Sequence, residues 1–185
     1  MARRPVSAEL APARGLGDPH AQTVWATACR FPRRLRLRSE TWDTADGDVV
    51  DVETLPERAG APGVLVLHGL EGSSRAIYVR GLLAAVDAKG WNGAALNFRS
   101  CGPSPHRLAR TYHSGFTDDL QLAATRLRAR WGTLAVAGFS LGGNVTLKWL
   151  GEQGAAAAAD AAVAISVPFD LGAAARAIDS PGFWG

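Results

Sequence analysis

Residues 133–143 read Thr-Leu-Ala-Val-Ala-Gly-Phe-Ser-Leu-Gly-Gly. The mostly apolar run up to Phe139 predicts a β-strand, and the residues after Ser140 predict a helix. Ser140 then lies in a sharp turn from strand to helix, where Gly138 and Gly142 meet the need for very small neighbours. A serine in such a turn projects its hydroxyl above the sheet, as a nucleophile does. The alternative for this pattern alone is a glycine-rich turn whose serine caps a helix.

The chain from Arg34 onward alternates predicted strands with predicted helices. Residues 34–38 alternate Arg with Leu and predict a strand. Residues 49–55 predict a second strand after the turn pair Asp46-Gly47, so a β-hairpin is expected first. The continuous apolar run 63–67 predicts a strand buried on both faces of a parallel sheet. Further strands are expected at 94–98, 133–139 and 162–167, and helices at about 74–88, 117–130 and 141–152. This order predicts an α/β fold with a mostly parallel sheet and an N-terminal antiparallel hairpin.

Length and composition predict one globular domain preceded by an arm. The 185 residues are enough for one sizeable core. An apolar share of 47% and a charged share of 20% exclude a disordered or collagen-like chain. Residues 1–33 scatter Pro, Gly and Arg without any sustained period. We therefore expect an N-terminal arm at 1–33 and an α/β domain at 34–185.

The charge distribution leaves one binding alternative open. A net charge of +3 is too small to require a polyanionic partner. Arginines are nevertheless dense where the arm meets the domain, at positions 30, 33, 34, 36 and 38, and such a cluster could bind nucleic acid or anionic lipid. We prefer an edge strand with one solvated face, because no nucleic-acid motif or aromatic series accompanies these arginines. We therefore expect no nucleic-acid partner, and a basic-arm binding module is the alternative.

The sequence indicates a cytoplasmic protein without a cofactor. No apolar leader segment follows the first residues, so we expect Cys29 and Cys101 to be reduced thiols. The longest apolar stretch, 154–169, is broken by Asp160 and Pro168, and we expect no transmembrane segment. The cysteines are far apart and the four histidines are isolated, so no metal site or cofactor is implied.

A second glycine-rich stretch follows the strand at 63–67, and residues 68–74 of this stretch read His-Gly-Leu-Glu-Gly-Ser-Ser. Acyl transfer builds negative charge on a carbonyl oxygen, and two backbone N–H groups aimed at that oxygen stabilise it. We expect these oxyanion-hole donors to be Leu141, directly after Ser140, and Leu70. His68 is expected to support the loop and not to act as a base. A phosphate-binding loop is the alternative, but neither of the usual phosphate-loop motifs is present.

Several stretches together resemble the YheT-type branch of the α/β-hydrolases, a group of serine esterases and lipases. The resemblance covers nearly all of residues 15–180. Two departures are visible, since Asp18 replaces the usual Asn and Ser100 stands where the family tends to have Gly. The matching stretches are 68–74, Asn97-Phe98-Arg99, Tyr112-His113-Ser114-Gly115, Asp118-Asp119-Leu120, 138–144 and, upstream, Asp18-Pro19-His20-Ala21-Gln22-Thr23.

The resemblance implies a carboxylic ester hydrolase acting on a small ester or lipid-like molecule. Ser140 would attack the acyl carbon, and water would release the acid from the acyl-enzyme. In this fold the catalytic acid and histidine follow the serine. All four histidines here precede Ser140, namely His20, His68, His106 and His113. The family's acid and histidine would therefore lie beyond residue 185, and Asp170 would have no histidine to orient.

The missing base leaves alternatives open. Losing the base of a triad costs on the order of a million-fold in turnover, so an inactive fragment or pseudo-hydrolase is the alternative to an active esterase. His106 or His113 could replace the base, because their loop opens on the same sheet edge as Ser140. The fold would also lack its C-terminal strands, which leaves 162–167 as an apolar edge strand. Such edges pair with other chains, so we expect self-association.

Overall fold

The computed structural model describes residues 12–18, 21–22, 25 and 34–179. The chain divides into two compact units, 1–32 and 33–185. Most of the predicted arm lies outside the described residues, as do His20 and Cys29.

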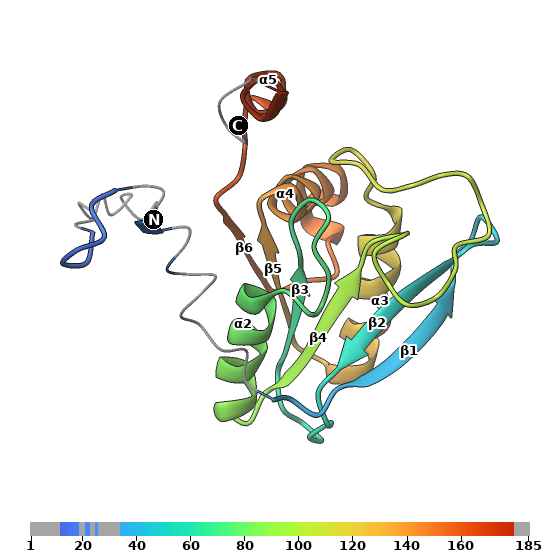
Figure 1. Cartoon of the computed structure of the whole chain (residues 1–185). Coiled ribbons are helices and arrows are strands. Elements are labelled where there is room, and N and C mark those ends of the chain that lie inside the picture. The colour runs from blue at the N-terminus through green and yellow to red at the C-terminus, as the bar shows by residue number, and fades with distance from the viewer. Residues whose placement is uncertain (1–11, 19–20, 23–24, 26–33, 180–185) are drawn as a thin grey trace. The chain divides into compact units, whose positions relative to one another are not determined.

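The second unit is built on a six-stranded sheet with the order β1-β2-β4-β3-β5-β6 (Figure 1). β1 pairs antiparallel with β2 and β2 pairs antiparallel with β4, while β4, β3, β5 and β6 run parallel. This arrangement confirms the predicted mostly parallel sheet with an N-terminal antiparallel hairpin. The strands are β1 (Arg38–Asp43), β2 (Val49–Thr54), β3 (Gly63–Leu67), β4 (Asn92–Asn97), β5 (Leu134–Phe139) and β6 (Ala161–Ile165).

The hairpin begins later than the alternation of Arg and Leu predicted. β1 starts at Arg38, and residues 34–37 have no regular secondary structure, so the strand expected at 34–38 is wrong. Leu35 and Leu37 still pack against the buried residues beneath the sheet's first covering helix. The alternation of Arg and Leu therefore indicates correctly which side chains face the core, although residues 34–37 do not pair with another strand.

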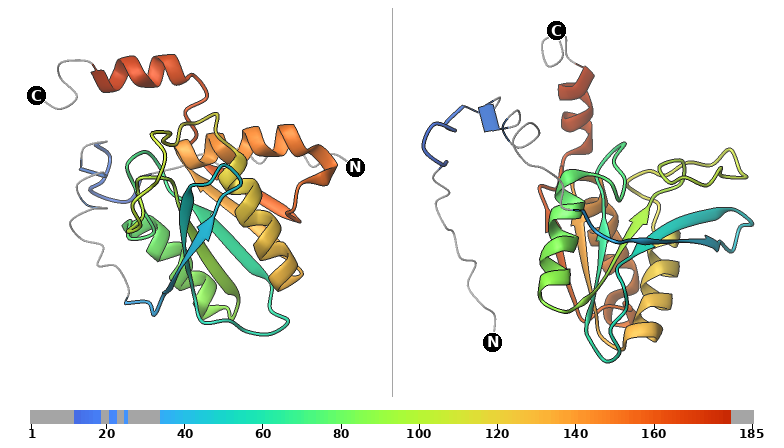
Figure 2. Two further views of the ribbon diagram at one scale, coloured as in Figure 1. Left: turned by 90° about the vertical axis from the view of Figure 1, so that its right-hand side faces the viewer. Right: turned by 60° about the horizontal axis from the view of Figure 1, so that its bottom comes forward.

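Helices cover both faces of the sheet (Figure 2). The helices are α2 (Ile77–Ala88), α3 (Asp118–Trp131), α4 (Leu141–Gln153) and α5 (Leu171–Asp179), with a 3₁₀ turn η1 (Gly154–Ala156) after α4. Val64 and Val66 of β3 pack with α2 residues, while Leu65 and Leu67 pack with residues of α3 and α4. All five residues of β3 are buried, as predicted for a strand covered on both faces.

The ends of two helices differ in detail from the prediction. α2 begins at Ile77, three residues later than expected. Thr117 stands at the N-cap position of α3, but its hydroxyl donates to Glu152 Oε2 at 2.6 Å and makes no cap hydrogen bond. The side chain therefore ties α3 to the end of α4 instead of satisfying a free N–H at the start of its own helix.

The far edge of the described sheet is apolar and open. β6 pairs with β5 alone among the described strands, and Val163 is 51% exposed. α5, which the sequence analysis did not predict, has no buried residue, and both Leu171 and Ile178 are exposed. The expected exposed edge is thus present in the structure, and the self-association expected from it stays a prediction.

Candidate active site

Three of the predicted stretches meet at one edge of the sheet. β3, β4 and β5 are parallel, so the residues that follow them emerge at the same carboxyl edge. His68, Phe98 and Ser140 directly follow these strands. A Cβ added to Gly69 would lie 3.2 Å from the Cβ of Ser140, which places the loop 68–74 beside the serine.

Ser140 occupies a strained backbone conformation between β5 and α4. Its φ of 51° and ψ of −117° lie in a region that L-residues rarely adopt, at a cost of about 1–3 kcal/mol. Three backbone hydrogen bonds hold the turn: the N–H donates to Ile165 at 2.8 Å, and the carbonyl accepts from Gly143 at 2.9 Å and Asn144 at 3.1 Å. The surrounding structure thus enforces the turn.

Two glycines around Ser140 have no room for a side chain. A Cβ on Gly138 would lie 2.3 Å from the carbonyl oxygen of Gly142 and 2.5 Å from Thr146 Oγ1. A Cβ on Gly142 would lie 2.5 Å from the carbonyl oxygen of His68. The start of α4 therefore packs directly on the beginning of the loop 68–74, and this close approach requires glycine.

His68 supports the loop through both ring nitrogens. The side chain is buried, and its Nε2 accepts the N–H of Phe98 at 3.1 Å. Nδ1 therefore carries the proton and donates to the carbonyl of Gly69 at 2.7 Å. Burial lowers the pKa of His68, which favours this neutral form. With both nitrogens engaged, His68 fits the supporting role expected from the sequence.

Among the described residues, the hydrogen bonds of the loop 68–74 leave the N–H of Leu70 without a partner. Four N–H groups of the loop donate to other groups: Gly69 to the Tyr78 hydroxyl at 2.9 Å, Glu71 to the Tyr112 hydroxyl at 2.7 Å, Gly72 to the Gly69 carbonyl at 3.1 Å and Ser74 to Asn97 Oδ1 at 2.8 Å. Within the described part of the chain, the N–H groups of Leu70 and Ser73 have no such partner, and Leu70 is 56% exposed. Of these two, the N–H of Leu70 lies next to Gly69, the residue that approaches Ser140. This group is therefore free to bind a ligand atom.

The described histidines do not reach Ser140 as bases. His106 Nδ1 lies 3.3 Å from the hydroxyl of Ser100, and His113 Nδ1 accepts the N–H of Gly115 at 3.1 Å. Asp170 accepts the N–H of Ala173 at 2.8 Å and so caps α5. In residues 34–179, none of these three side chains has a hydrogen bond to Ser140, so the structure does not bring together a triad there.

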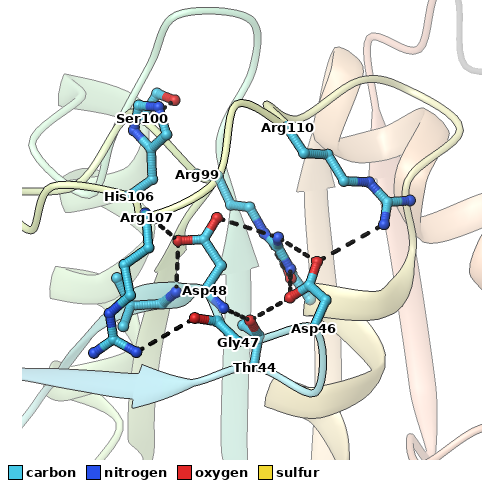
Figure 3. A network of polar contacts seen from close by, with 11 residues as sticks. Thr44, Asp46, Gly47, Asp48, Arg99, Ser100, His106, Arg107 and Arg110 are labelled. Carbon is cyan, nitrogen blue, oxygen red and sulfur yellow. Dashed lines mark hydrogen bonds and ion pairs between the residues drawn. The ribbon is translucent and has the colours of Figure 1, made fainter.

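A buried arginine beside the site is the feature that sequence reasoning missed (Figure 3). Arg99 is 2% exposed and directly follows Phe98. Its guanidinium binds Asp119 at 2.8 Å, Asp46 at 2.7 Å and Asp48 at 3.3 Å. Arg99 thereby holds the pKa of the Asp46 carboxyl well below its usual range. The cluster ties the end of β4 to the turn of the hairpin and to the first turn of α3.

The acidic hairpin also anchors the loop 99–116. The N–H of Arg107 donates to Asp48 Oδ1 at 2.6 Å, and the N–H of Ser104 donates to Asp51 Oδ2 at 2.8 Å. Figure 3 shows Arg107 and Arg110 reaching the hairpin from this loop, with Asp46 as the partner of Arg110. The same loop carries Tyr112, so the hairpin helps to fix a residue that contacts the loop 68–74.

Two negative findings apply to residues 12–18, 21–22, 25 and 34–179. In these ranges, no group of three or more His, Cys, Asp or Glu side chains could hold a metal ion. No helix there has both the length and the apolar character needed to cross a membrane. Cys101 is a free thiol, and burial raises its pKa.

Comparison with known proteins now defines the class to which this fold and site belong. Residues 62–181 match the family described as alpha/beta hydrolase fold. The chain therefore belongs to the alpha/beta hydrolase family. The crystal structure of a serine hydrolase without a lid from Xanthomonas campestris has a TM-score of 0.57 and 27% identity, covering 75% of this chain and 66% of that one. An esterase of Pyrococcus furiosus, at 23% identity, TM-score 0.66 and coverage of 78% and 54%, shows the fold alone.

The resemblance to the YheT-type branch is also confirmed. YheT of Escherichia coli (strain K12) is 37% identical over 170 residues, which cover 89% of this chain and 50% of that protein. The monoacylglycerol lipase of Saccharomyces cerevisiae is 33% identical over 122 residues, covering 64% of this chain and 27% of that protein. The chain thus spans half the length, or less, of these curated relatives.

Proposed function

We propose that this chain carries the nucleophile and the oxyanion-binding groups of a carboxylic ester hydrolase. The observation that carries the proposal is the position of Ser140, in a strained turn at the carboxyl edge of β5 and beside the loop 68–74. Strain of this kind persists where the surrounding structure enforces it, and it clusters at active sites. In the proposed reaction, Ser140 Oγ attacks the acyl carbon of an ester, the alcohol leaves, and water hydrolyses the acyl-enzyme.

Two N–H groups are suited to stabilise the oxyanion. Leu141 is the first residue of α4, where N–H groups have no intrahelical partner and the helix dipole favours negative charge. Leu70 supplies the second donor, since the N–H groups of Gly69 and Glu71 on either side of it are already engaged. Removing one such donor costs about 2.7–4 kcal/mol in comparable enzymes. Gly138 and Gly142 permit the turn that brings Ser140 and Leu141 to this position.

The proposed reaction needs a base that residues 34–179 do not place at Ser140. A serine hydroxyl is a weak nucleophile until a base accepts its proton. We infer that the histidine and the acid come from polypeptide outside the described part of the chain. A chain without them would be a pseudo-hydrolase, which is the second candidate function.

The relatives support a proposal for the substrate class. The yeast relative is a monoacylglycerol lipase, so we propose a small ester or lipid-like acyl ester for this chain as well. The cytoplasmic location expected from the sequence remains a prediction. The basic-arm alternative would require steeply salt-dependent retention on DNA.

A fluorophosphonate probe tests the proposal, because it reacts with activated serine hydroxyls. The probe is applied to the chain together with the polypeptide that supplies the histidine and the acid, and we expect labelling of the wild type, loss of labelling in Ser140→Ala, and retention in Ser166→Ala. Ser166 is a matched control, since it also has a positive φ, of 53°, and follows the neighbouring strand β6. Absence of labelling in the wild type, or labelling that survives Ser140→Ala, would contradict the proposal and favour the pseudo-hydrolase.

A further inference from the structure

We infer that the hydroxyl groups of Tyr78 and Tyr112 are positioning groups that present the N–H of Leu70 to the acyl oxygen at Ser140. The inference rests on the proposed function, and it assigns a role to two side chains that sequence reasoning did not select. Neither tyrosine is a catalytic residue, since each acts through the backbone of the loop 68–74.

Tyr78 holds the first part of the loop from the side of α2. It lies in the first turn of α2, and its ring packs against that of Phe139 with 4.8 Å between the ring centroids. Phe139 directly precedes Ser140, so the ring position is tied to the nucleophile's own strand. From there the hydroxyl of Tyr78 accepts the N–H of Gly69 at 2.9 Å.

Tyr112 holds the second part of the loop from the opposite side. Its ring stacks on Phe98 at 5.1 Å with an interplanar angle of 6°, and its hydroxyl accepts the N–H of Glu71 at 2.7 Å. Burial raises the pKa of Tyr112 to about 12, so this hydroxyl stays protonated at neutral pH.

Glu71 shows why such support is needed. Its φ of 52° lies in the left-handed region, which is unfavourable for a residue other than glycine. The hydrogen bond to Tyr112 holds the N–H of this strained residue in place. Without the bond, we expect the loop to relax toward a conformation with a negative φ at Glu71, which would turn the preceding peptide groups as well.

The direction of the Leu70 N–H follows from the planarity of its peptide group. In a trans peptide, the C=O of one residue and the N–H of the next point in opposite directions. The carbonyl of Gly69 is held by His68 Nδ1 at 2.7 Å and by the N–H of Gly72 at 3.1 Å. The N–H of Leu70 must therefore point away from His68 and Gly72. With Gly69 and Glu71 clamped on either side, this peptide group cannot easily rotate.

The test compares Tyr78→Phe and Tyr112→Phe with the wild type in two measurements. Phe keeps the ring contacts and removes only the hydroxyl. The first measurement is hydrogen exchange of the Gly69, Leu70 and Glu71 amides by NMR. The second is the concentration dependence of fluorophosphonate labelling, which separates the half-saturating probe concentration from the maximal labelling rate. Ser104→Ala is the control. Ser104 lies on the same loop as Tyr112, and the substitution removes a hydroxyl that donates to Asp51 of β2.

We expect Tyr112→Phe to lower the protection of the Glu71 amide by about ten-fold or more, and Tyr78→Phe to do the same for Gly69. Each variant should lower the maximal labelling rate by about ten-fold, a part of the roughly 10²–10³-fold that one oxyanion donor contributes. The half-saturating concentration and the Tm should stay near the wild-type values, and Ser104→Ala should change none of these quantities at the site.

Three outcomes would overturn the inference. Unchanged amide protection would show that the hydroxyl groups do not hold the loop. Lost protection with an unchanged labelling rate would show that the tyrosines support the loop without positioning Leu70 for the reaction. A wild-type protein that contains the proposed histidine and acid and is not labelled at all, with both amides protected, would refute the proposed function and leave the tyrosines as loop supports only.

Discussion

The backbone N–H of Ser140 donates to the carbonyl oxygen of Ile165, the last residue of β6, at 2.8 Å. The strained turn after β5 is therefore a continuation of the parallel ladder between β5 and β6. This links the conformation of the candidate nucleophile to the strand at the open edge of the described sheet. Changes at the turn and changes at this edge should therefore affect one another.

Replacing Ser140 by glycine should separate stability from function. Glycine adopts the observed positive φ without the strain that a side chain brings, so Ser140→Gly should raise the free energy of unfolding by about 1 kcal/mol. Ser140→Ala keeps the strain and should leave stability nearly unchanged. Both variants should abolish fluorophosphonate labelling. Urea unfolding checks the prediction, and a Ser140→Gly protein less stable than Ser140→Ala would speak against strain at this residue.

Two glycines of α4 should respond in opposite ways to alanine. A Cβ at Gly142 would collide with the carbonyl of His68, so Gly142→Ala should lose about 1–3 kcal/mol of stability and displace the loop 68–74. Gly151 is exposed and has nothing within 4 Å of an added Cβ, so Gly151→Ala should gain up to about 1 kcal/mol. Thermal unfolding and labelling of the two variants provide the comparison. Equal effects would contradict the close packing of α4 on the loop.

The fold was predictable where the local sequence indicates that a segment is buried or that a turn requires small residues. All five residues of β3 were identified, because a continuous apolar run reflects burial on both faces. The turn at Ser140 was visible because small neighbours are a local requirement. The start of β1 was misplaced, since alternation shows which side faces the core and not whether a strand pairs beside it. α5 was missed, although Asp170 at its start is a recognisable N-cap residue.

The support of the candidate site was not predictable from spacing. Arg99 binds carboxylates 53, 51 and 20 positions away in the sequence, at Asp46, Asp48 and Asp119. Tyr112 reaches Glu71 across 41 positions. Such contacts follow no helical or strand period, because only the tertiary fold brings these residues together. The family resemblance identified Arg99 and Tyr112 as members of matching stretches, but it did not say what they contact.

Removing Arg99 should cost far more than removing a surface arginine. Arg99→Met leaves the buried carboxylate of Asp119 and that of Asp48 without their cation, which costs about 3–5 kcal/mol in comparable cases. Arg58→Met breaks a half-exposed ion pair with Asp87, worth about 0–1 kcal/mol, and an exposed hydrogen bond to the carbonyl of Trp91. Urea unfolding at neutral pH measures both. A loss below about 1 kcal/mol for Arg99→Met would contradict a structural role of the buried cluster.

Asp46 should make stability depend on pH at the acid end. Arg99 lowers the pKa of Asp46 in the folded protein, so the folded state binds this proton less readily than the unfolded state. The resulting stability is present above the unfolded pKa of about 3.9 and is lost as pH falls through the folded value. The stability difference between wild type and Asp46→Asn should therefore be constant above about pH 5 and shrink below about pH 4.

Urea unfolding between neutral and acid pH follows this difference directly. Asp87→Asn is the control, because Asp87 belongs to the half-exposed pair with Arg58 and its loss should change stability little at any pH. A difference between wild type and Asp46→Asn that grows toward acid pH would have the wrong sign for a carboxylate held ionised by Arg99.

The open edge at β6 should drive self-association of the chain. Residues 161–165 read Ala-Ala-Val-Ala-Ile, without the charges or proline that usually protect an edge strand. Val163→Lys places a charge in this strand and should shift the protein toward the monomer in sedimentation velocity or light scattering. Leu108→Lys is the control, since Leu108 is also an exposed apolar residue but lies in the loop 99–116, which is anchored to the hairpin at the other edge of the sheet. A wild-type chain that is monomeric at high concentration, or an equal effect of both lysines, would refute pairing through β6.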